Sequence, residues 1–319
     1  MLQSRVVSGV LLGGLMALVS GVAPGQDYPN KPVRIITAPP GGGGDLVSRL
    51  LAQGITGPLG QPVIVDNRPA VLLGEIGAKA TPDGYSILVL GGSFTIGPLL
   101  QKQPYDAEKD FAAVVMIGVS PNILVVHPSV QVKSVKELIA LAKAKPGTLN
   151  YGSTSIGGSA HLAAELFRSM AGINILHVPY KGAPAALTAL LGGEIQLLFP
   201  GVPAATPHVK AGRMTALAVT TVKPSALAPG VPTIAASGLP GYDATSMDGV
   251  YAPAGTPAAI INRLNREIVR FITRPEIREK FLGFGLEVVG GTPAELGAAV
   301  RAEIVLWSRV IKEAGIKAN

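Results

Sequence analysis

The sequence contains no cysteine. This absence excludes disulfide bonds, thiolate metal ligands, a thiol nucleophile and a cysteine-linked lipid anchor. Aromatic residues are also scarce, at 5% of the chain with a single tryptophan, which is too few for the stacking platforms of proteins that bind single-stranded nucleic acid. The net charge of +7 is spread without runs of Lys or Arg, so it describes a basic surface and predicts no nucleic-acid partner.

Recognisable catalytic patterns are missing as well. The four histidines, His127, His161, His177 and His208, form no pair at metal-binding spacing. No Gly-x-Ser-x-Gly elbow is present, so a serine hydrolase of that type has no sequence support. We therefore predict no metal, no cofactor and no catalytic residue, and we expect binding without chemistry.

The chain begins with the pattern of an export signal. Arg5 precedes an apolar, uncharged stretch over residues 6–22, and small residues precede Gln26. These features predict a signal peptide over residues 1–25, cleaved near Gln26, and a mature protein in the periplasm. An uncleaved membrane anchor is the alternative, but the apolar stretch is short for a span and no stop-transfer flank follows it.

A glycine-rich loop follows the first apolar run of the mature chain. Residues 33–36 read as a buried strand, and residues 46–55 have apolar positions at helical spacing. The candidate ligand-binding residues between them are Pro40, Gly41, Gly42, Gly43 and Asp45. Bare backbone N–H groups ahead of a helix can hold a carboxylate or phosphate, and Asp45 suits a first-turn acid. A connection without a ligand is the alternative, and the loop lacks the endings of a P-loop or a dinucleotide fingerprint.

Two further loops repeat this arrangement. Ser93 follows a strand over residues 85–90, and a loop of small and hydroxyl residues follows a strand over residues 149–151. The candidate donors in the latter are Ser153, Thr154, Ser155, Gly157, Gly158 and Ser159. Alternating strands and helices predict an α/β fold of two domains, with mostly parallel sheets, helices on both faces and ligands at the carboxyl ends of strands. Otherwise these residues only cap helices.

Three side chains near these loops have two interpretations each. His161, Tyr180 and Lys181 either reach the ligand or only pack and meet solvent. If Ser153 or Ser159 worked with His161, the chain would be an exported hydrolase, and this alternative stays open. Two helix N-termini that face a shared cleft instead suit a hinged solute trap.

A series of short motifs runs in order through the mature chain. They include Pro39-Pro-Gly-Gly42, Val65-x-Asn-Arg-Pro69, Pro82-Asp-Gly-Tyr85, Lys145-Pro-Gly147, His177-Val-Pro-Tyr-Lys-Gly182 and Gly290-Gly-Thr-Pro293. Together these motifs resemble the Bug-type extracytoplasmic solute-binding receptors of tripartite tricarboxylate transporters.

The resemblance implies a two-domain fold of the type II periplasmic-binding class, with the chain crossing between domains twice. We expect domain 1 to comprise residues 26–121 plus 249–319, and domain 2 residues 122–248. The resemblance also implies a small organic carboxylate held by the two loops, with Pro200 and Gly201 among the residues lining the rest. Its partners would be the membrane permease subunits, and we expect the receptor to be a monomer.

Two acids stand where the family pattern places the cleft. From these positions we expect Glu75 and Asp248 to face the ligand and to repel its additional carboxylates. The receptor would then disfavour tricarboxylates such as citrate and prefer a ligand with one anchored carboxylate and a less anionic far end. A ligand sensor for a signalling partner is a further alternative, since it would share the fold but not the permease.

Overall fold

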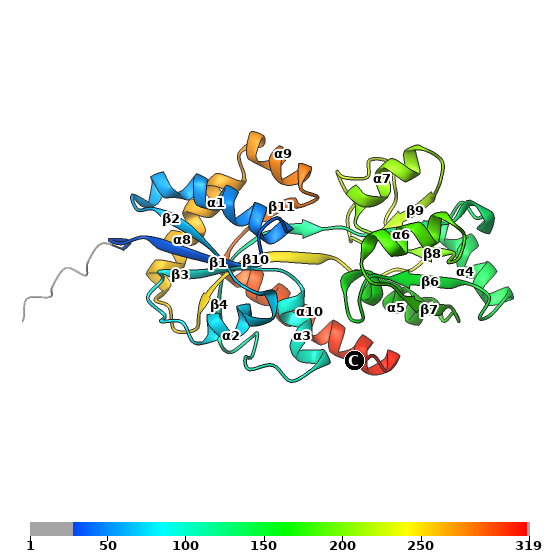
Figure 1. The fold of residues 1–319 in the computed structure, drawn as a ribbon, viewed down its shortest axis with the longest axis horizontal. Helices are drawn as coiled ribbons and strands as arrows, with labels where there is room; N and C mark the ends of the chain where they lie inside the picture. Colours follow the sequence, from blue (N-terminus) through cyan, green and yellow to red (C-terminus); the bar gives the residue numbers. More distant parts are fainter. Residues whose placement is uncertain (1–27, 318–319) are drawn as a thin grey trace, which may run out of the picture.

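The computed structural model describes residues 28–317. The predicted signal peptide and its cleavage site near Gln26 lie outside these residues. Figure 1 shows two lobes joined by extended segments, each lobe built on one sheet with helices on both faces. None of the helices between residues 28 and 317 combines the length and the apolar character of a membrane span.

The first lobe is built on a sheet with the strand order β11-β4-β10-β3-β1-β2. The strands are β1 (Val33–Thr37), β2 (Val63–Asn67), β3 (Ser86–Leu90), β4 (Phe111–Ser120), β10 (Ser246–Pro253) and β11 (Glu287–Gly290). One face packs on α1 (Gly43–Leu59), α8 (Ala258–Ile272) and α9 (Pro275–Gly283), and the other on α2 (Leu73–Ala78), α3 (Ser93–Leu100) and α10 (Pro293–Ala314). Ile35 and Ile36 lie in opposite cores because successive strand side chains alternate between faces.

The second lobe repeats this layout on a smaller sheet, with the order β7-β6-β8-β5-β9. Its strands are β5 (Ile123–Val126), β6 (Asn150–Ser153), β7 (Leu176–Pro179), β8 (Leu197–Leu198) and β9 (Thr215–Val219). Helices α4 (Val135–Ala144) and α5 (Ser159–Ala171) cover one face, and α6 (Ala183–Leu191) and α7 (Val202–Lys210) cover the other. Two short 3₁₀ helices, η1 (Ala70–Leu72) and η2 (Pro128–Val130), complete the described elements.

Most strands in each sheet point the same way. In the first sheet β1, β2, β3 and β4 share one direction, while β10 and β11 run against them. In the second sheet only β5 is reversed. The predicted α/β class, with mostly parallel strands and helices on both faces, is confirmed. Among the reversed strands, β5 and β10 each begin directly after a crossing between the lobes, whereas β11 does not.

The chain passes between the lobes twice, as the resemblance implies. The first crossing runs from β4 through Pro121 and Asn122 into β5. After β9 the chain stays in the core of the second lobe as far as Ala244, and the second crossing runs from there through Thr245 into β10. Thr220 ties the two crossings together, because Asn122 N–H donates to Thr220 Oγ1 at 3.0 Å and Ala244 N–H donates to Thr220 O at 3.1 Å. Since β10 pairs with β4 from Ser246 onward, we propose a second domain boundary at residues 245/246 instead of 248/249.

Helix α10 spans both lobes. It begins with a capping box, in which Thr292 Oγ1 accepts from Glu295 N–H and the Glu295 carboxylate accepts from Thr292 N–H. Leu296 and Val300, near its start, are buried in the core of the first lobe. Trp307, Val310 and Ile311, near its end, are buried in the core of the second lobe. The helix is therefore a third link between the lobes, made by packing.

Asp45 holds the first glycine loop in shape. Its buried carboxylate accepts from Gly41 N–H at 3.0 Å and from the Asn67 amide at 2.9 Å, and it pairs with Arg49 Nε at 3.0 Å. Gly41 has φ = +85°, a left-handed conformation that glycine adopts without strain. Arg49, the Gly41 N–H and the Asn67 amide together lower the pKa of Asp45 to about 2. Asp45 is thus a first-turn acid, as predicted, whose carboxylate faces the protein.

Replacing Asp45 with Asn is expected to lower the free energy of unfolding by about 1–3 kcal/mol at pH 7, because charge-assisted bonds to Gly41 and Arg49 are lost. The pKa of Asp45 is lower in the folded than in the unfolded chain, so this contribution is present above about pH 4 and lost as pH falls toward 2. Urea unfolding at pH 7 and pH 3 measures the difference.

The matched control is Glu276→Gln, which removes an exposed first-turn acid of α9. It should change stability by less than about 0.5 kcal/mol. An Asp45→Asn loss no larger than the control, or a loss equally large at both pH values, would contradict this role.

Candidate functional site

The carboxyl ends of β1 and β3 open onto a cavity of about 390 Å³, which we call the cleft cavity. Part of its wall is apolar, with side chains from η1, α2, β3 and α3. These include Val71, Leu73, Leu90 and Phe94. The polar groups are Ser93 at the start of α3, Gln101, Gln103 and Tyr105 beyond that helix, and Asp248 on β10. The cavity therefore offers an apolar wall together with hydrogen-bonding groups.

Some of the predicted residues of the first lobe line the cleft cavity and others do not. Ser93 and Asp248 line the cleft cavity, and Gly44 of the first loop lines its edge. Pro40, Gly41, Gly42 and Gly43 are exposed on the adjoining loop. Glu75 does not line the cavity, and its carboxylate pairs with Lys79 Nζ at 2.6 Å.

Asp248 is the one carboxyl group among the residues that line the cleft cavity. It lies against Gly91, where an added Cβ would be 2.6 Å from Asp248 Oδ1. Within residues 28–317 it has neither an ion-pair partner nor a hydrogen-bond partner. Burial raises the pKa of Asp248 to about 6. When protonated, this carboxyl group can donate to a ligand carboxylate, and when ionised it repels one.

The second small-residue loop meets the first lobe across the cleft. It lies between β6 and α5, and Gly157 packs against Leu100 of α3, where an added Cβ would be 2.2 Å from Leu100 Cδ1. Gly157 also has φ = +73°, so both contact and conformation require glycine here. Thr154, Ser155, Gly158 and Ser159 keep exposed surface on this loop. The predicted donors of the second lobe therefore stand beside the helix that lines the cleft cavity.

Two stacked histidines support this loop from behind. The rings of His161 and His177 lie 4.0 Å apart, His161 Nδ1 accepts from Gly157 N–H at 2.9 Å, and His177 Nε2 shares a hydrogen bond of 2.7 Å with Ser153 Oγ. Burial and the neighbouring His177 lower the pKa of His161 to about 4, and burial also lowers that of His177. Both rings are neutral at pH 7 and act as structural hydrogen-bond partners.

The Ser/His arrangement of the hydrolase alternative is not formed. That alternative required Ser153 or Ser159 to work with His161, but Ser153 bonds to His177 and is fully buried. His161 instead bonds to the backbone of Gly157. Ser153 has no exposed surface with which to attack a substrate. Ser159 is exposed, but no hydrogen bond joins it to His161 within residues 28–317, so neither serine is paired with that histidine.

The remaining predicted residues lie at the edges of the second lobe. Tyr180 N–H donates to Ser153 O at 2.9 Å, which places the end of β7 beside the loop, and Lys181 is exposed. Pro200 O accepts from Ile123 N–H at 2.9 Å, and Gly201 forms a bridge with Asn122. Pro200 and Gly201 therefore sit at the first crossing between the lobes.

Sequence reasoning missed Gln101, Gln103 and Tyr105, which line the cleft cavity. They follow α3 in an irregular segment, where no periodic pattern indicates which side chains point inward. Tyr105 is fixed by its hydroxyl, which donates to Phe94 O at 3.0 Å, and its ring stacks on Phe94. The one available signal was the position of this segment shortly after Ser93, which the sequence places at the end of a predicted strand.

Comparison with known proteins identifies the fold and the family. BugT of Bordetella pertussis is 34% identical over 95% of this chain and 96% of its own. The structure of R. palustris Rpa4515 with adipate is 35% identical, with a TM-score of 0.73 over 91% of this chain and 99% of that chain. MatC (Rpa3494) from Rhodopseudomonas palustris with bound malate is 26% identical, with a TM-score of 0.69 over 89% and 100%.

A profile described as the tripartite tricarboxylate transporter family receptor matches residues 47–316. Members of this family are periplasmic solute-binding receptors and are not enzymes. The match covers most of both lobes, including both crossings, β6 and α5. This chain belongs to the tripartite tricarboxylate transporter receptor family.

Proposed function

We propose that this receptor captures a small organic dicarboxylate in the cleft cavity and delivers it to the permease subunits of a tripartite tricarboxylate-type transporter. The observation that carries the proposal is the cleft cavity itself. It has the size of a small-molecule pocket, it combines an apolar wall with convergent polar groups, and the second loop stands beside it. Proteins similar to this chain were solved with adipate and with malate bound, both of which are dicarboxylates.

The buried and the exposed members of the predicted site have different roles in this proposal. Ser93, Asp248 and the exposed residues of the two loops contact the ligand. Asp45, Ser153 and His161 position those loops, because their side chains are buried and bonded to the protein. Lys181 and Tyr180 approach the second carboxylate when the lobes close, while Pro200 and Gly201 bend with the first crossing. Glu75 makes no ligand contact.

Asp248 sets the charge selectivity of the cavity. Lys79 forms an ion pair with Glu75, which does not line the cavity. Asp248 does line it and has no cation beside it, so Asp248 is the acid that meets the ligand. One ligand carboxylate can bind a protonated Asp248, but a third carboxylate adds charge that the cavity does not neutralise. A dicarboxylate is therefore preferred to citrate.

Adipate affinity is expected to weaken at least threefold between pH 6.5 and pH 8.5. The pKa of Asp248 is about 6 in the free protein, and a bound carboxylate raises it further, so binding takes up a proton. Affinity is then highest below that pKa and falls as pH rises. Asp248→Asn should remove the dependence, because the amide donates a hydrogen bond at every pH. Isothermal titration calorimetry at the two pH values measures it.

The control is Glu75→Gln, whose affinity should follow the same pH profile as the unmodified protein. Two results would count against the proposed role of Asp248. One is an affinity that is unchanged or stronger at pH 8.5. The other is an identical pH profile in Asp248→Asn.

Export and processing belong to the same proposal. We expect the exported protein to begin at or near Gln26, because small residues precede that position and an uncharged stretch precedes them. The intact mass of the protein recovered from the periplasm tests this. Recovery of a chain that keeps Arg5 in the membrane fraction would show that the segment is an anchor.

Measuring ligand uptake by cells distinguishes a transport receptor from a ligand sensor that shares this fold. Cells that lack the receptor should lose high-affinity uptake of labelled adipate and regain it when the gene is restored. We expect the purified receptor to be a monomer, which sedimentation measures. Unimpaired uptake with a changed transcriptional response to adipate would favour the sensor.

A further inference from the structure

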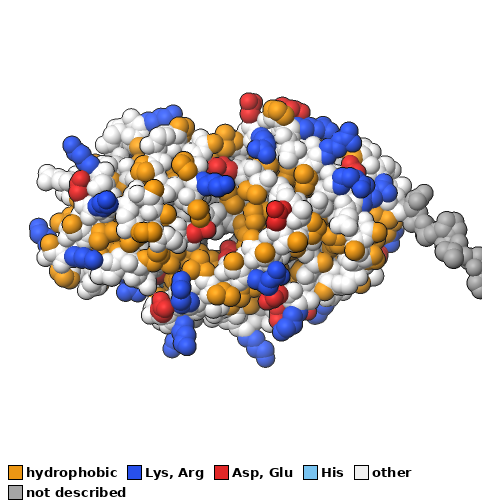
Figure 2. All heavy atoms as spheres, turned by 180° about the vertical axis from the view of Figure 1, so that it is seen from behind, with side chains coloured by type: hydrophobic (Ala, Val, Ile, Leu, Met, Phe, Trp, Pro, Cys, Tyr) orange, Lys and Arg blue, Asp and Glu red, His pale blue; other side chains and the backbone are white. Residues whose placement is uncertain are grey.

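A second cavity, of about 520 Å³, lies against β4 and β10, and we call it the hinge cavity. Met247 of β10 lines it, whereas the next residue, Asp248, lines the cleft cavity, because neighbouring strand residues point to opposite faces. Its other walls come from β4, β11 and α10 of the first lobe and from residues 221–224 and Asp243, in the segment between β9 and β10. Figure 2 shows a hollow between the lobes with acidic side chains around it.

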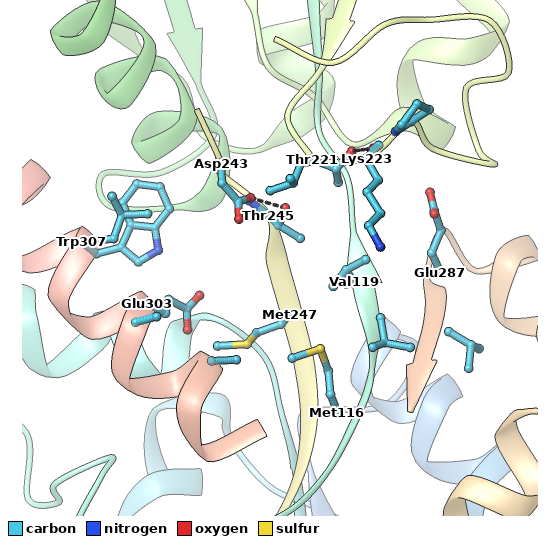
Figure 3. A pocket seen from close by; sticks show the side chains of 17 residues that line it. Met116, Val119, Thr221, Lys223, Asp243, Thr245, Met247, Glu287, Glu303 and Trp307 are labelled. Carbon is cyan, nitrogen blue, oxygen red and sulfur yellow. Dashed lines mark hydrogen bonds between the residues drawn. The ribbon is translucent and has the colours of Figure 1, made fainter. Parts of the chain in front are cut away.

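The floor and one side of the hinge cavity are apolar. Met116 and Met247 lie on adjacent strands at its base, and the indole ring of Trp307 stands on α10 at one side (Figure 3). Val119 and Leu306 add to this surface. Trp307 is the only tryptophan in the chain, so the cavity contains a natural fluorescent reporter.

Three carboxyl groups line the hinge cavity against one ammonium group. Asp243, Glu287 and Glu303 come from three different segments, and Lys223 is the sole basic residue of the lining (Figure 3). None of these four residues forms an ion pair within residues 28–317. The lining therefore carries a formal excess of two negative charges when all three acids are ionised.

The carboxyl groups are held in place by neutral donors. Thr95 Oγ1 donates to Glu303 Oε2 at 2.6 Å and Thr245 N–H donates to Asp243 Oδ1 at 3.0 Å, while the Ser225 hydroxyl donates to Glu287. Burial raises the pKa of Glu303 to about 7, against the smaller opposite effects of hydrogen bonds from Thr95 and Trp307. The acids are thus fixed in position without a counter-charge.

We propose that the hinge cavity is a second ligand site, which binds an organic cation with an ammonium head and an apolar body. Glu303 and Asp243 attract the ammonium group by their charge. The methionine-rich floor accommodates the apolar body. The cavity is too large and too apolar for a bare metal ion, and residues 28–317 hold no cluster of three ligands suited to one. This site is independent of the carboxylate proposed for the cleft cavity.

The test titrates the purified receptor, without any carboxylate ligand, with 2-phenylethylammonium and with the neutral analogue 2-phenylethanol at pH 8. Trp307 fluorescence and calorimetry report binding. The cation is expected to bind saturably and about tenfold more tightly than the alcohol, because only the cation is attracted by the charge of the carboxylates. Absence of saturable cation binding, or equal affinity for both compounds, would overturn the proposal.

Variants locate the site. Glu303→Gln is expected to weaken the affinity for the cation at least threefold and to change the affinity for the alcohol by less than twofold. The control is Glu313→Gln, on the same helix but outside the hinge cavity, which should change neither affinity. Ala302→Phe should fill the cavity and abolish binding of both compounds, and its thermal unfolding shows whether it folds. If Ala302→Phe does not fold, Val289→Phe blocks the opposite wall from an exposed position. Unchanged cation binding in a folded blocking variant, or equal losses in Glu303→Gln and Glu313→Gln, would refute the site.

Discussion

The arrangement of the two lobes depends on side chains that helix α10 buries in both of them. Leu296 and Val300 belong to one core, and Trp307 and Ile311 belong to the other. Withdrawing an apolar side chain of this size from a core costs roughly 1.5–3 kcal/mol, so these contacts resist separation of the lobes. Any closure of the cleft must therefore bend the two crossings and α10 together, with both ends of the helix still buried.

Each lobe presents its small-residue loop to the cleft, and each loop is held from behind by buried polar groups. In the first lobe this is the carboxylate of Asp45, bonded to Gly41, Asn67 and Arg49. In the second lobe it is the neutral ring of His161, bonded to Gly157. Rigid support of exposed backbone lowers the entropy that a ligand must remove on binding. The same support explains why the polar side chains of Asp45 and His161 bond to protein atoms.

The loops and the fold class could be predicted from the sequence because strand, small-residue loop and helix recur with clear periodicity around Gly41 and Gly157. Helices α3 and α7 were not evident, since each has an internal proline, Pro98 or Pro207, that weakens a helical pattern. The hydrogen-bond and ion-pair partners of individual side chains could not be predicted from the sequence either. Which histidine meets Ser153, and whether Glu75 or Asp248 is neutralised, depends on contacts between distant segments and not on spacing.

The central claim, that the cleft selects a small dicarboxylate, is tested most directly by identifying what the receptor retains when it is isolated from the cells that make it. Native mass spectrometry of the gently purified periplasmic protein, followed by release and mass measurement of the bound compound, gives that identity without a choice of test ligand. The account predicts one molecule of a small aliphatic or hydroxylated dicarboxylic acid per chain, displaced by added adipate. A sugar, a nucleotide or a tricarboxylate that adipate does not displace would contradict it.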